Sequence, residues 1–477
     1  MNFRKTKIIC TLGPAVDSEE MLRKLMEGGM NCARFNFSHG THETHLATLN
    51  RLRRIRDELG YPVATMMDTK GPEIRIKSFQ NGPITLNPGD HFILTTWDME
   101  GTDNEVSVTY ENLHNEVAPG TRILIDDGLI ELRVENIEGQ DIHCTVVSGG
   151  PLSNNKSINI PDTKIHLPAL TDKDREDLRF AAENDFDFVA AYFIRKAQDV
   201  IDIREELAKW GGERIRIIAK IENREGVENF DEILAASDGA MVARGDLGVE
   251  IPAYEVPMIQ KTMISKSALA GKNVVTATQM LDSMMRNPRP TRAEVSDVAN
   301  AVFDGTSCVM LSGETASGKY PLEALDIMVR TVEAAEAAID YRDRFIRQFE
   351  LDRQVGSQSI DQAISHTCCM TAIDLNASAI LAATTSGHSA RMISRVRPPC
   401  PIIGLTTSEK CRRQMAISFG VQPLLYGSVD STDRLFALCV ETVRKEGVVQ
   451  SGETVVITAG VPLSSRGTTN LIKVQVV

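Results

Sequence analysis

The stretch IRIIAKIEN (residues 215–223) decides the fold, together with GAMVARGDLG (residues 239–248). Each begins as a short apolar run and ends in charged residues and a turn. Apolar runs of this length between turn signals are typical of buried parallel strands. Lys220 and Glu222 are two positions apart, so at a strand end their side chains point the same way. Asp246 follows the second run and would bring another carboxylate to the same place.

A lysine beside two carboxylates at strand ends indicates a specific chemistry. Carboxylates are the hard oxygen ligands that magnesium prefers, and a fixed cation suits a phosphorylated anion. The plainer alternative is a structural ion pair at a strand end, which is common in folded proteins. The rest of the chain favours the first interpretation.

Composition narrows the classes of function. The chain has 477 residues, 42% of them apolar and 25% charged, which is ordinary for a soluble globular protein with more than one domain. The net charge of −13 argues against general nucleic-acid binding, which usually needs a basic face. A local basic pocket for a phosphorylated small molecule is compatible with an acidic chain.

Targeting and redox features favour a cytoplasmic protein. The apolar run near the N-terminus is too short for a signal peptide, and no later run approaches a membrane span, so we expect no membrane partner. The nine cysteines are odd in number and include no CxxC pair, which indicates reduced core thiols. A catalytic cysteine has no local support.

Apolar runs that alternate with helical patterns predict a barrel. Helices are expected at residues 41–59 and 172–183, and Ser18 would cap another. Eight strand–helix units match a (β/α)₈ TIM barrel, in which functional residues follow the strands. The eight strands are expected at residues 5–12, 32–38, 63–69, 186–194, 215–220, 240–243, 273–277 and 308–312.

Two further regions interrupt or follow this alternation. Residues 73–167 carry short alternating strands and no long helix, which predicts an inserted all-β lid domain, a small barrel. After Arg342 the pattern predicts a separate three-layer α/β domain, with a helix at 359–375. Its strands are expected at residues 379–383, 402–405, 422–425 and 454–458. The predicted limits are 1–72 and 168–342 for the barrel, 73–167 for the lid and 343–477 for the C-terminal domain.

Polar side chains follow at least six of the predicted barrel strands. Arg34, Asn36 and Ser38 alternate and so share a face. The GDLG turn would point backbone N–H groups at an anion such as a substrate carboxylate. Cations for phosphate, carboxylates for metal and hydroxyls for a proton path form one coherent set. The other members are Asp68, Thr69, Glu73, Arg75, Lys220, Glu222, Asp246, Thr278 and Ser312.

Two other motifs are set aside. GETASGK at residues 313–319 resembles a P-loop, but Tyr320 stands where a magnesium-binding Ser or Thr is required, and Pro321 follows. Arg244 opens the adhesion tripeptide Arg-Gly-Asp, which we interpret as a turn at a strand end.

A series of longer motifs closely resembles the pyruvate kinase family. They occur in the family's order over nearly the whole chain, so together they are far more specific than any one of them. The motifs are RFNFSHG (34–40), DTKGPEIR (68–75), KIEN (220–223), MVARGDLG (241–248), TATQMLDSM (276–284), NPRPTRA (287–293), DVAN (297–300) and MLSGETA (310–316).

The resemblance implies transfer of phosphate from phosphoenolpyruvate to ADP, giving pyruvate and ATP in the last step of glycolysis. By this resemblance Glu222 and Asp246 bind Mg²⁺ (or Mn²⁺). Lys220 would lie at the transferring phosphoryl group and the developing enolate, where a fixed cation is most useful. The resemblance also implies a homotetramer with a phosphorylated small-molecule effector.

The remaining roles are likewise implied by the resemblance. Potassium would be bound by Asn36, Ser38, Asp68 and Thr69, and Glu73 matches the potassium-dependent form, which has lysine in independent members. Arg34 and Arg75 would hold phosphates, and Gly245, Asp246 and Thr278 would bind the substrate carboxylate. Thr278 and Ser312 would form the route of the proton, with a bound water as the alternative donor. The nucleotide would be bound by Arg75, His39, Lys156 and Asn159. Lid closure would exclude water.

Three positions depart from the family pattern. Tyr192 stands where serine is common, so local packing or ion affinity would differ. Ser157 and Asp162 stand where glycines are usual in the lid segment, which bears on lid flexibility and nucleotide affinity.

The segment TTSGHS resembles the family's effector-phosphate loop. Small hydroxyl residues and glycine at a helix start suit a phosphate, although an ordinary helix cap is the alternative. The ligand would be a sugar phosphate or a nucleoside monophosphate, covered by the loop at residues 464–469. The residues are Thr384, Thr385, Ser386, Gly387, His388 and Ser389, with histidine where arginine or lysine is often found.

Two rival functions stay open from the sequence. A magnesium-dependent aldolase or lyase acting on pyruvate enolate would use Glu222 and Asp246 but would need neither a lid lysine nor ADP. A non-catalytic metabolite-binding protein would not need the intact set of Arg34, Lys220, Glu222, Asp246 and Thr278.

Overall fold

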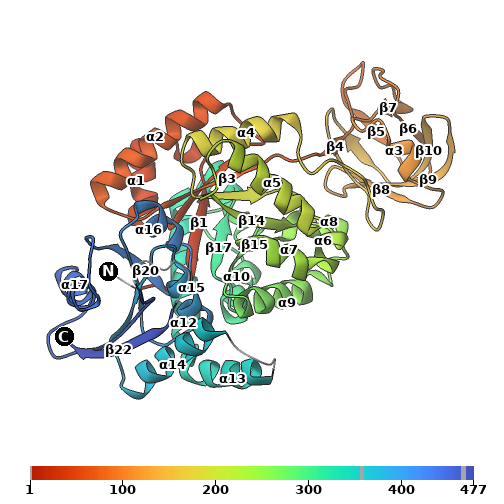
Figure 1. The fold of residues 1–477 in the computed structure, drawn as a ribbon. Coiled ribbons are helices and arrows are strands. Elements are labelled where there is room, and N and C mark those ends of the chain that lie inside the picture. Colours follow the sequence, from red (N-terminus) through yellow and green to blue (C-terminus); the bar gives the residue numbers. More distant parts are fainter. Residues whose placement is uncertain (1–2, 355–358, 463–468) are drawn as a thin grey trace.

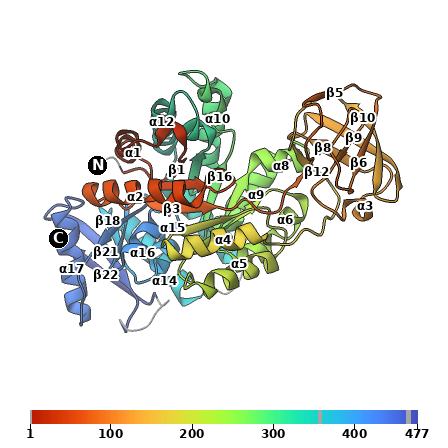
Figure 2. The same cartoon turned by 90° about the horizontal axis from the view of Figure 1, so that it is seen from above.

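The computed structural model of the chain describes residues 3–354, 359–462 and 469–477. It has a central barrel, an inserted β domain and a C-terminal α/β domain (Figure 1). The two smaller domains lie on opposite sides of the barrel in both views (Figures 1 and 2). The predicted fold class is therefore confirmed.

Eight parallel strands form the closed barrel, in the order β1-β17-β16-β15-β14-β13-β3-β2. Nearly every residue in these strands is buried, which explains why they are continuous apolar runs in the sequence. The eight predicted strands are confirmed. Their bounds are β1 Lys7–Thr11, β2 Cys32–Asn36, β3 Ala64–Asp68, β13 Phe188–Ala191, β14 Arg216–Ile221, β15 Gly239–Ala243, β16 Asn273–Ala277 and β17 Cys308–Leu311.

Helices cover the outside of the barrel, and several begin at side-chain caps (Figure 1). Ser18 accepts a hydrogen bond from Met21 N, as the sequence predicted. Thr41 and Thr171 start capping boxes at two helices whose caps were not predicted. The helices are α1 Glu19–Glu27, α2 His42–Leu59, α4 Asp172–Glu183, α5 Ala197–Lys209, α6 Arg224–Glu228, α7 Phe230–Ala236, α8 Arg244–Glu250, α9 Val256–Leu269, α10 Arg292–Asp304, α11 Gly313–Ala316 and α12 Pro321–Ala337. Short 3₁₀ helices lie at Pro14–Val16 and Asp282–Met285.

The inserted domain is a seven-stranded sheet of order β4-β12-β8-β9-β10-β6-β7, with a two-stranded sheet, β11-β5, beside it. An isolated bridge between Ile76 and Val108 joins the ends of β4 and β7, so the larger sheet curls toward a barrel. The elements are β4 Ile74–Arg75, β5 Ile84–Leu86, β6 His91–Thr95, β7 Glu105–Ser107, α3 Leu113–Glu116, β8 Arg122–Ile125, β9 Ile130–Glu138, β10 Asp141–Ser148, β11 Gly150–Leu152 and β12 Ser157–Asn159.

The C-terminal domain is a five-stranded sheet of order β20-β19-β18-β21-β22 with a hydrophobic core on each face. The four predicted strands are confirmed, and β22, antiparallel to β21, was not predicted. The predicted limit at residue 342 falls inside α13, and the domain limits stay a prediction. The elements are α13 Tyr341–Gln354, α14 Ile360–Asp374, β18 Ala379–Ala383, α15 His388–Arg395, β19 Ile402–Thr406, α16 Glu409–Met415, β20 Val421–Leu425, α17 Thr432–Lys445, β21 Thr454–Ala459 and β22 Leu471–Val476.

The C-terminal domain completes the core of the barrel. Ile417, just after α16, is fully buried and packs in one cluster with inward-facing barrel residues such as Ile9 and Met310. Its carbonyl lies 3.2 Å from Cys308 Sγ at the beginning of β17. One side chain of another domain therefore closes the amino end of the barrel.

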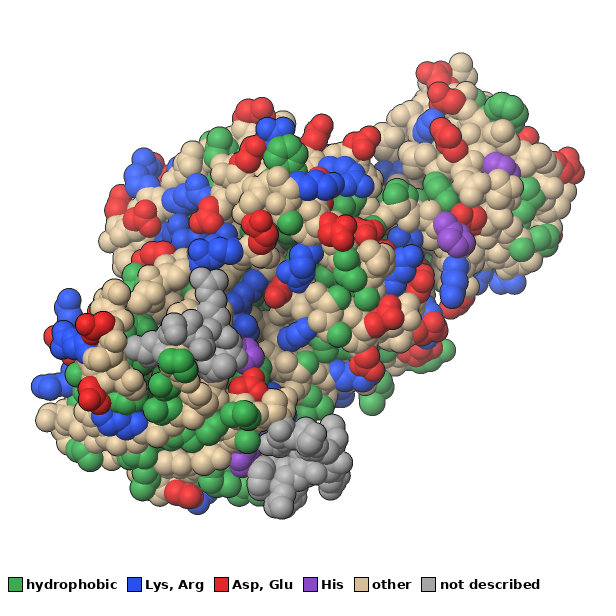
Figure 3. Space-filling view, viewed as in Figure 1, with side chains coloured by type: hydrophobic (Ala, Val, Ile, Leu, Met, Phe, Trp, Pro, Cys, Tyr) green, Lys and Arg blue, Asp and Glu red, His purple; other side chains and the backbone are tan. Residues whose placement is uncertain are grey.

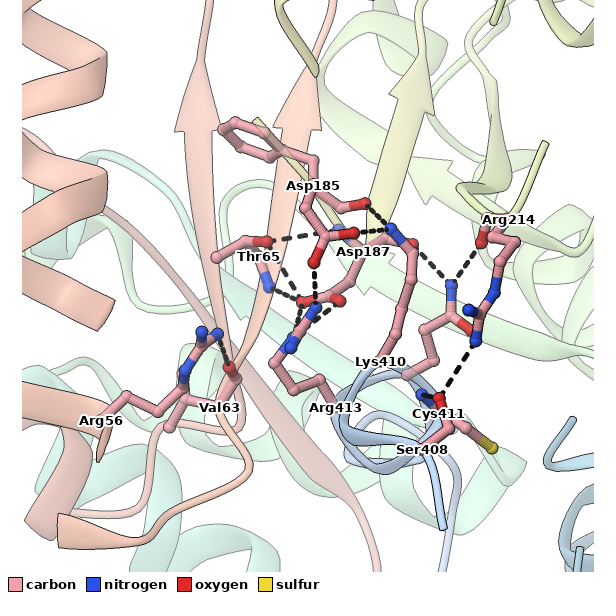
Figure 4. A network of polar contacts seen from close by, with 12 residues as sticks. Arg56, Val63, Thr65, Asp185, Asp187, Arg214, Ser408, Lys410, Cys411 and Arg413 are labelled. Carbon is pink, nitrogen blue, oxygen red and sulfur yellow. Dashed lines mark hydrogen bonds and ion pairs between the residues drawn. The ribbon is translucent and has the colours of Figure 1, made fainter. Parts of the chain in front are cut away.

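An ion-pair network fixes this junction (Figure 4). Arg413 on α16 donates to both carboxylate oxygens of Asp187, at 2.9 and 3.0 Å, and to Asp185 at 2.7 Å. Asp187 is fully buried before β13 and also accepts from Thr65 N and Oγ1 on β3. Burial raises the pKa of Asp187, and the Arg413 charge opposes that rise. The network ties α16 to the beginnings of two barrel strands.

The surface is mixed in charge. On the face shown in Figure 3, acidic and basic side chains are interspersed over the barrel domain. Within the described ranges, no helix combines the length and the apolar character that crossing a membrane requires.

Replacing Arg413 tests this junction. Arg413→Met would leave Asp187 buried without its cation, so we expect the free energy of unfolding to fall by about 3–5 kcal/mol in urea denaturation. As a control, Arg330→Met removes an exposed pair with Asp326 and should change it by less than about 1 kcal/mol. An Arg413→Met protein as stable as the control would contradict the role given to the network.

Candidate active site

Lys220 lies at the carboxyl end of β14, and its ammonium is buried among carboxylates. Nζ is 2.9 Å from Glu222 Oε1 and 3.3 Å from Asp68 Oδ1. Burial alone would lower the pKa of Lys220, but Asp68, Glu222 and Asp246 outweigh it and raise that pKa. The lysine is therefore a permanent cation at the mouth of the barrel. The predicted pairing of Lys220 and Glu222 on one face is seen here.

Glu222 is fully buried, and each of its carboxylate oxygens has a partner. Oε2 accepts from Phe193 N at 2.6 Å, and Oε1 forms the ion pair with Lys220. Burial raises the pKa of Glu222 to about 8, with Lys220 opposing the rise and Asp246 adding to it. Asp246 lies in the first turn of α8, directly after β15. Two carboxylates that repel each other and follow neighbouring strands fit a divalent cation.

Arg34 and Asp68 join the lysine cluster from neighbouring strands. Arg34 Nε donates to Asp68 Oδ2 at 2.6 Å, and Arg34 NH1 donates to Thr11 Oγ1 at 2.9 Å. Burial would raise the pKa of Asp68, but Arg34 and Lys220 together lower it. Two cations therefore share one carboxylate at the carboxyl ends of β2, β3 and β14, and this arrangement suits an anionic substrate.

Thr278 and Gly245 meet after β16 and β15. Thr278 has a φ of 65°, and its Oγ1 accepts from Gly245 N at 2.6 Å. Arg244 holds this turn from behind, because it donates to Thr278 O at 2.8 Å and to Asp297 at 2.7 Å. The sequence interpretation gave Arg244 no such role. The sequence feature that could have indicated this role is a basic residue at a strand end, next to the predicted substrate loop.

Ser312 lies where β17 ends, as predicted. Its N–H donates to Glu314 Oε2 at 2.7 Å, while its hydroxyl is buried and makes no hydrogen bond within the described part of the chain. A buried hydroxyl with unused hydrogen-bonding capacity is suited to relay a proton or hold a water.

The four predicted potassium ligands lie at two adjacent strand ends. Asn36 of β2 is in register with Asp68 of β3. Asn36 Oδ1 accepts from Ser38 N at 3.1 Å, and Thr69 Oγ1 accepts from Tyr192 N at 3.1 Å. Each oxygen keeps a further lone pair, so an all-oxygen alkali-ion site fits the residues present.

A cavity of about 490 Å³ lies between the lid and the barrel. Its lining includes Arg75, Lys156, Asn159, Tyr192 and Asp246, so it brings together three of the four predicted nucleotide residues and one predicted metal ligand.

Within the cavity, the predicted nucleotide residues have carboxylate partners. Lys156 pairs with Asp126 at 2.9 Å, and Asn159 donates to Glu250 at 2.8 Å. Arg75 pairs with Glu73 and donates to Asn155 O. The fourth predicted residue, His39, is exposed and is not part of the lining.

The three unusual residues all lie at this cavity. Asp162 has a φ of 59°, the left-handed region that favours glycine, which gives a physical reason for the glycine expected there. Ser157 Oγ donates to Asp127 at 3.2 Å. The Tyr192 ring centroid lies 4.6 Å from Lys220 Nζ.

A second cavity, of about 180 Å³, lies at the TTSGHS segment. Thr384, Thr385, Ser386, His388 and Ser389 line it, and Gly387 N donates to Thr384 Oγ1 at 2.9 Å. His388 is paired with Asp361 at 2.6 Å, and Ser389 is bonded to Thr469. The rest of the predicted covering loop, residues 464–468, lies outside the described residues.

Comparisons with known proteins cover the whole chain. The family models described as "Pyruvate kinase, barrel domain" and "Pyruvate kinase, alpha/beta domain" match residues 3–325 and 362–475. A pyruvate kinase of Sporosarcina psychrophila is 49% identical over 477 residues, which is all of this chain and 81% of that protein. A pyruvate kinase of Clostridium acetobutylicum is 48% identical over 476 residues, with both chains fully covered.

The fold comparison agrees. A crystal structure of a pyruvate kinase from Cryptosporidium parvum superposes with a TM-score of 0.94 at 40% identity, covering 99% of this chain and 96% of that one. With matches of both domains and relatives close to half identical along its whole length, the chain belongs to the pyruvate kinase family.

Proposed function

We propose that the chain transfers the phosphoryl group of phosphoenolpyruvate to ADP, giving pyruvate and ATP. The observation that carries the proposal is the buried Lys220 ammonium held between Asp68 and Glu222 at the mouth of the barrel. A cation fixed there is aimed at negative charge that develops during phosphoryl transfer. Family membership supports a phosphotransferase.

Two positive side chains would hold and polarise the substrate phosphate. Lys220 would contact the transferring phosphoryl group and the developing enolate oxygen, and Arg34 would bind the phosphate from β2. Both are pre-ordered by Asp68, so little side-chain entropy is lost on binding. Mg²⁺ (or Mn²⁺) held by Glu222 and Asp246 would supply further charge neutralisation.

The substrate carboxylate and the proton route fit the ends of β15, β16 and β17. The N–H groups at Gly245 and Asp246 open a helix, and Thr278 Oγ1 lies beside them. A carboxylate bound there would place the enolate carbon near Thr278 and Ser312, the candidates for the route of the proton that completes pyruvate. A bound water is the alternative donor.

The lid would supply the nucleotide-binding half of the site. Arg75, Lys156 and Asn159 face the cavity, and each is now paired with protein oxygens that ADP phosphates would replace. Closing the lid would remove water from the transferring group, which favours ADP over water as acceptor. This cavity, lined by the lid side chains Arg75, Lys156 and Asn159, favours a kinase over the lyase alternative, which has no need of it.

The regulatory and assembly proposals rest on family membership. A sugar phosphate or nucleoside monophosphate would bind the cavity at residues 384–389, and isothermal titration calorimetry with each class would test it. The pairing of His388 with Asp361 places a carboxylate there and counts against tight anion binding. The homotetramer and the cytoplasmic location stay predictions.

Removing the lysine charge tests the proposed reaction. In Lys220→Met the developing enolate would lose its fixed cation, so kcat for pyruvate formation should fall about 10³-fold or more. Circular dichroism and Mn²⁺ binding should stay close to those of the original chain. Lys24→Met, which removes an exposed lysine on α1, should leave kcat unchanged. Substantial turnover by Lys220→Met would remove Lys220 from its assigned role.

The proposed potassium site is tested by replacing a carboxylate with an ammonium at residue 73. We expect turnover to need phosphoenolpyruvate, ADP and Mg²⁺ and to rise with K⁺, since a monovalent cation would complete the oxygen set at Asn36, Ser38, Asp68 and Thr69. Glu73→Lys places an ammonium near this region and should reduce the dependence of kcat on K⁺. If K⁺ does not change the turnover of the original chain, the proposed kinase reaction is still supported, but the proposed potassium site is contradicted.

A further inference from the structure

Tyr192 is fixed in place by its own backbone segment. Its N–H donates to Thr69 Oγ1 at 3.1 Å, and the N–H of Phe193, the next residue, donates to Glu222 Oε2 at 2.6 Å. Phe193 has a φ of 52°, a conformation that non-glycine residues rarely adopt and that surrounding contacts must maintain. The backbone that carries the Tyr192 ring is thus bonded to a potassium ligand on one side and to a metal ligand on the other.

The ring itself has little freedom. Gly71 has a φ of 66°, and a Cβ at that position would collide with the Tyr192 ring. The ring therefore fills the space that this glycine leaves open. Its face lies 4.6 Å from Lys220 Nζ, within the range of a cation–π contact.

The other neighbours of the Lys220 ammonium have competing uses. Asp68 is shared with Arg34, and Glu222 would turn toward a divalent cation when the metal binds. An aromatic face attracts an ammonium without neutralising it, and a metal ion that prefers oxygen ligands does not take it away. The ring is thus a partner for Lys220 that metal binding would not take away.

We infer that Tyr192 is a positioning residue for Lys220, and that its aromatic face keeps the ammonium aimed at the phosphoryl site after the metal has taken Glu222. The inference rests on the proposed phosphoryl transfer. A serine at this position could not make the contact, so this chain orients the lysine in its own way.

The ring, and not the hydroxyl, carries the inference. The Tyr192 side chain lines the cavity between lid and barrel, and its hydroxyl makes no hydrogen bond within the described residues. Phenylalanine should therefore replace it in the positioning role.

Matched substitutions separate the ring from its volume. Tyr192→Phe keeps the aromatic face and should retain kcat within about twofold, whereas Tyr192→Met keeps much of the volume and should lower kcat about tenfold. The fall in kcat of Tyr192→Met should exceed any change in its KM for ADP, because Lys220 does not hold the nucleotide, although Tyr192 lines the cavity that would. Tyr254→Met, on a tyrosine that is 81% exposed, is the control and should match the original chain.

Two kinetic outcomes would overturn the inference. One is a Tyr192→Met enzyme as fast as the original chain. The other is a Tyr192→Phe enzyme as slow as Tyr192→Met, which would assign the role to the hydroxyl.

A spectroscopic readout distinguishes failure of this inference from failure of the proposed function. In protein labelled with ¹³C at lysine Cε, the Lys220 resonance, assigned with Lys220→Met, should show an upfield ring-current shift. The shift should persist in Tyr192→Phe and disappear in Tyr192→Met. If the shift follows this pattern in a chain that makes no pyruvate, the contact between Tyr192 and Lys220 is supported and the proposed function is wrong. If the shift is absent from the original chain, the inference about Tyr192 is wrong at any rate of turnover.

Discussion

The structure depends on a positive charge buried at the mouth of the barrel. The ammonium of Lys220 is out of water, and isolated burial of such a group would cost several kcal/mol. Asp68 and Glu222, from β3 and β14, make that burial possible, and Arg34 shares Asp68. These residues lie on or just after β2, β3 and β14, far apart in the sequence, so the charge cluster exists only in the folded chain. The same cluster that satisfies the lysine also prepares it for a phosphorylated substrate.

The opposite end of the barrel has its own requirement. The eight strands leave a space at their amino ends that Ile417 fills, and Arg413 bonds to Asp187 beside it. Asp187 precedes β13, which leads to Tyr192, and its partner Thr65 lies on β3, which ends at Asp68. The contacts of the C-terminal domain and the candidate active site therefore share two strands, with one set of contacts at each end.

The barrel was predictable because its strands are buried on both faces. Burial produces uninterrupted apolar runs, and the polar residue after each run then indicates the carboxyl end. The pairing of Lys220 with Glu222 followed from their spacing alone. A local signal also predicted the cap at Ser18. These features depend on residues close together in the sequence.

Other features depend on contacts between residues that are far apart in the sequence, and no local sequence pattern predicts them. Ile417 reads as part of an ordinary core, and nothing near Arg413 shows that Asp187 is its partner. The alternating exposure of β22 is a weak signal at a chain end, so that strand was missed. Arg244 was taken for part of a turn because its carbonyl and carboxylate partners lie 33 to 53 residues away. The contact between Tyr192 and Lys220 is of the same kind.

The central claim is that the phosphoryl group passes directly to ADP and not to water. Phosphorus NMR of the chain with phosphoenolpyruvate, ADP, Mg²⁺ and K⁺ follows that group directly. The account predicts that the substrate resonance is replaced by the γ-phosphate of ATP, with inorganic phosphate at the level of an enzyme-free sample. Release of inorganic phosphate in step with pyruvate, or loss of substrate without ATP, would contradict it.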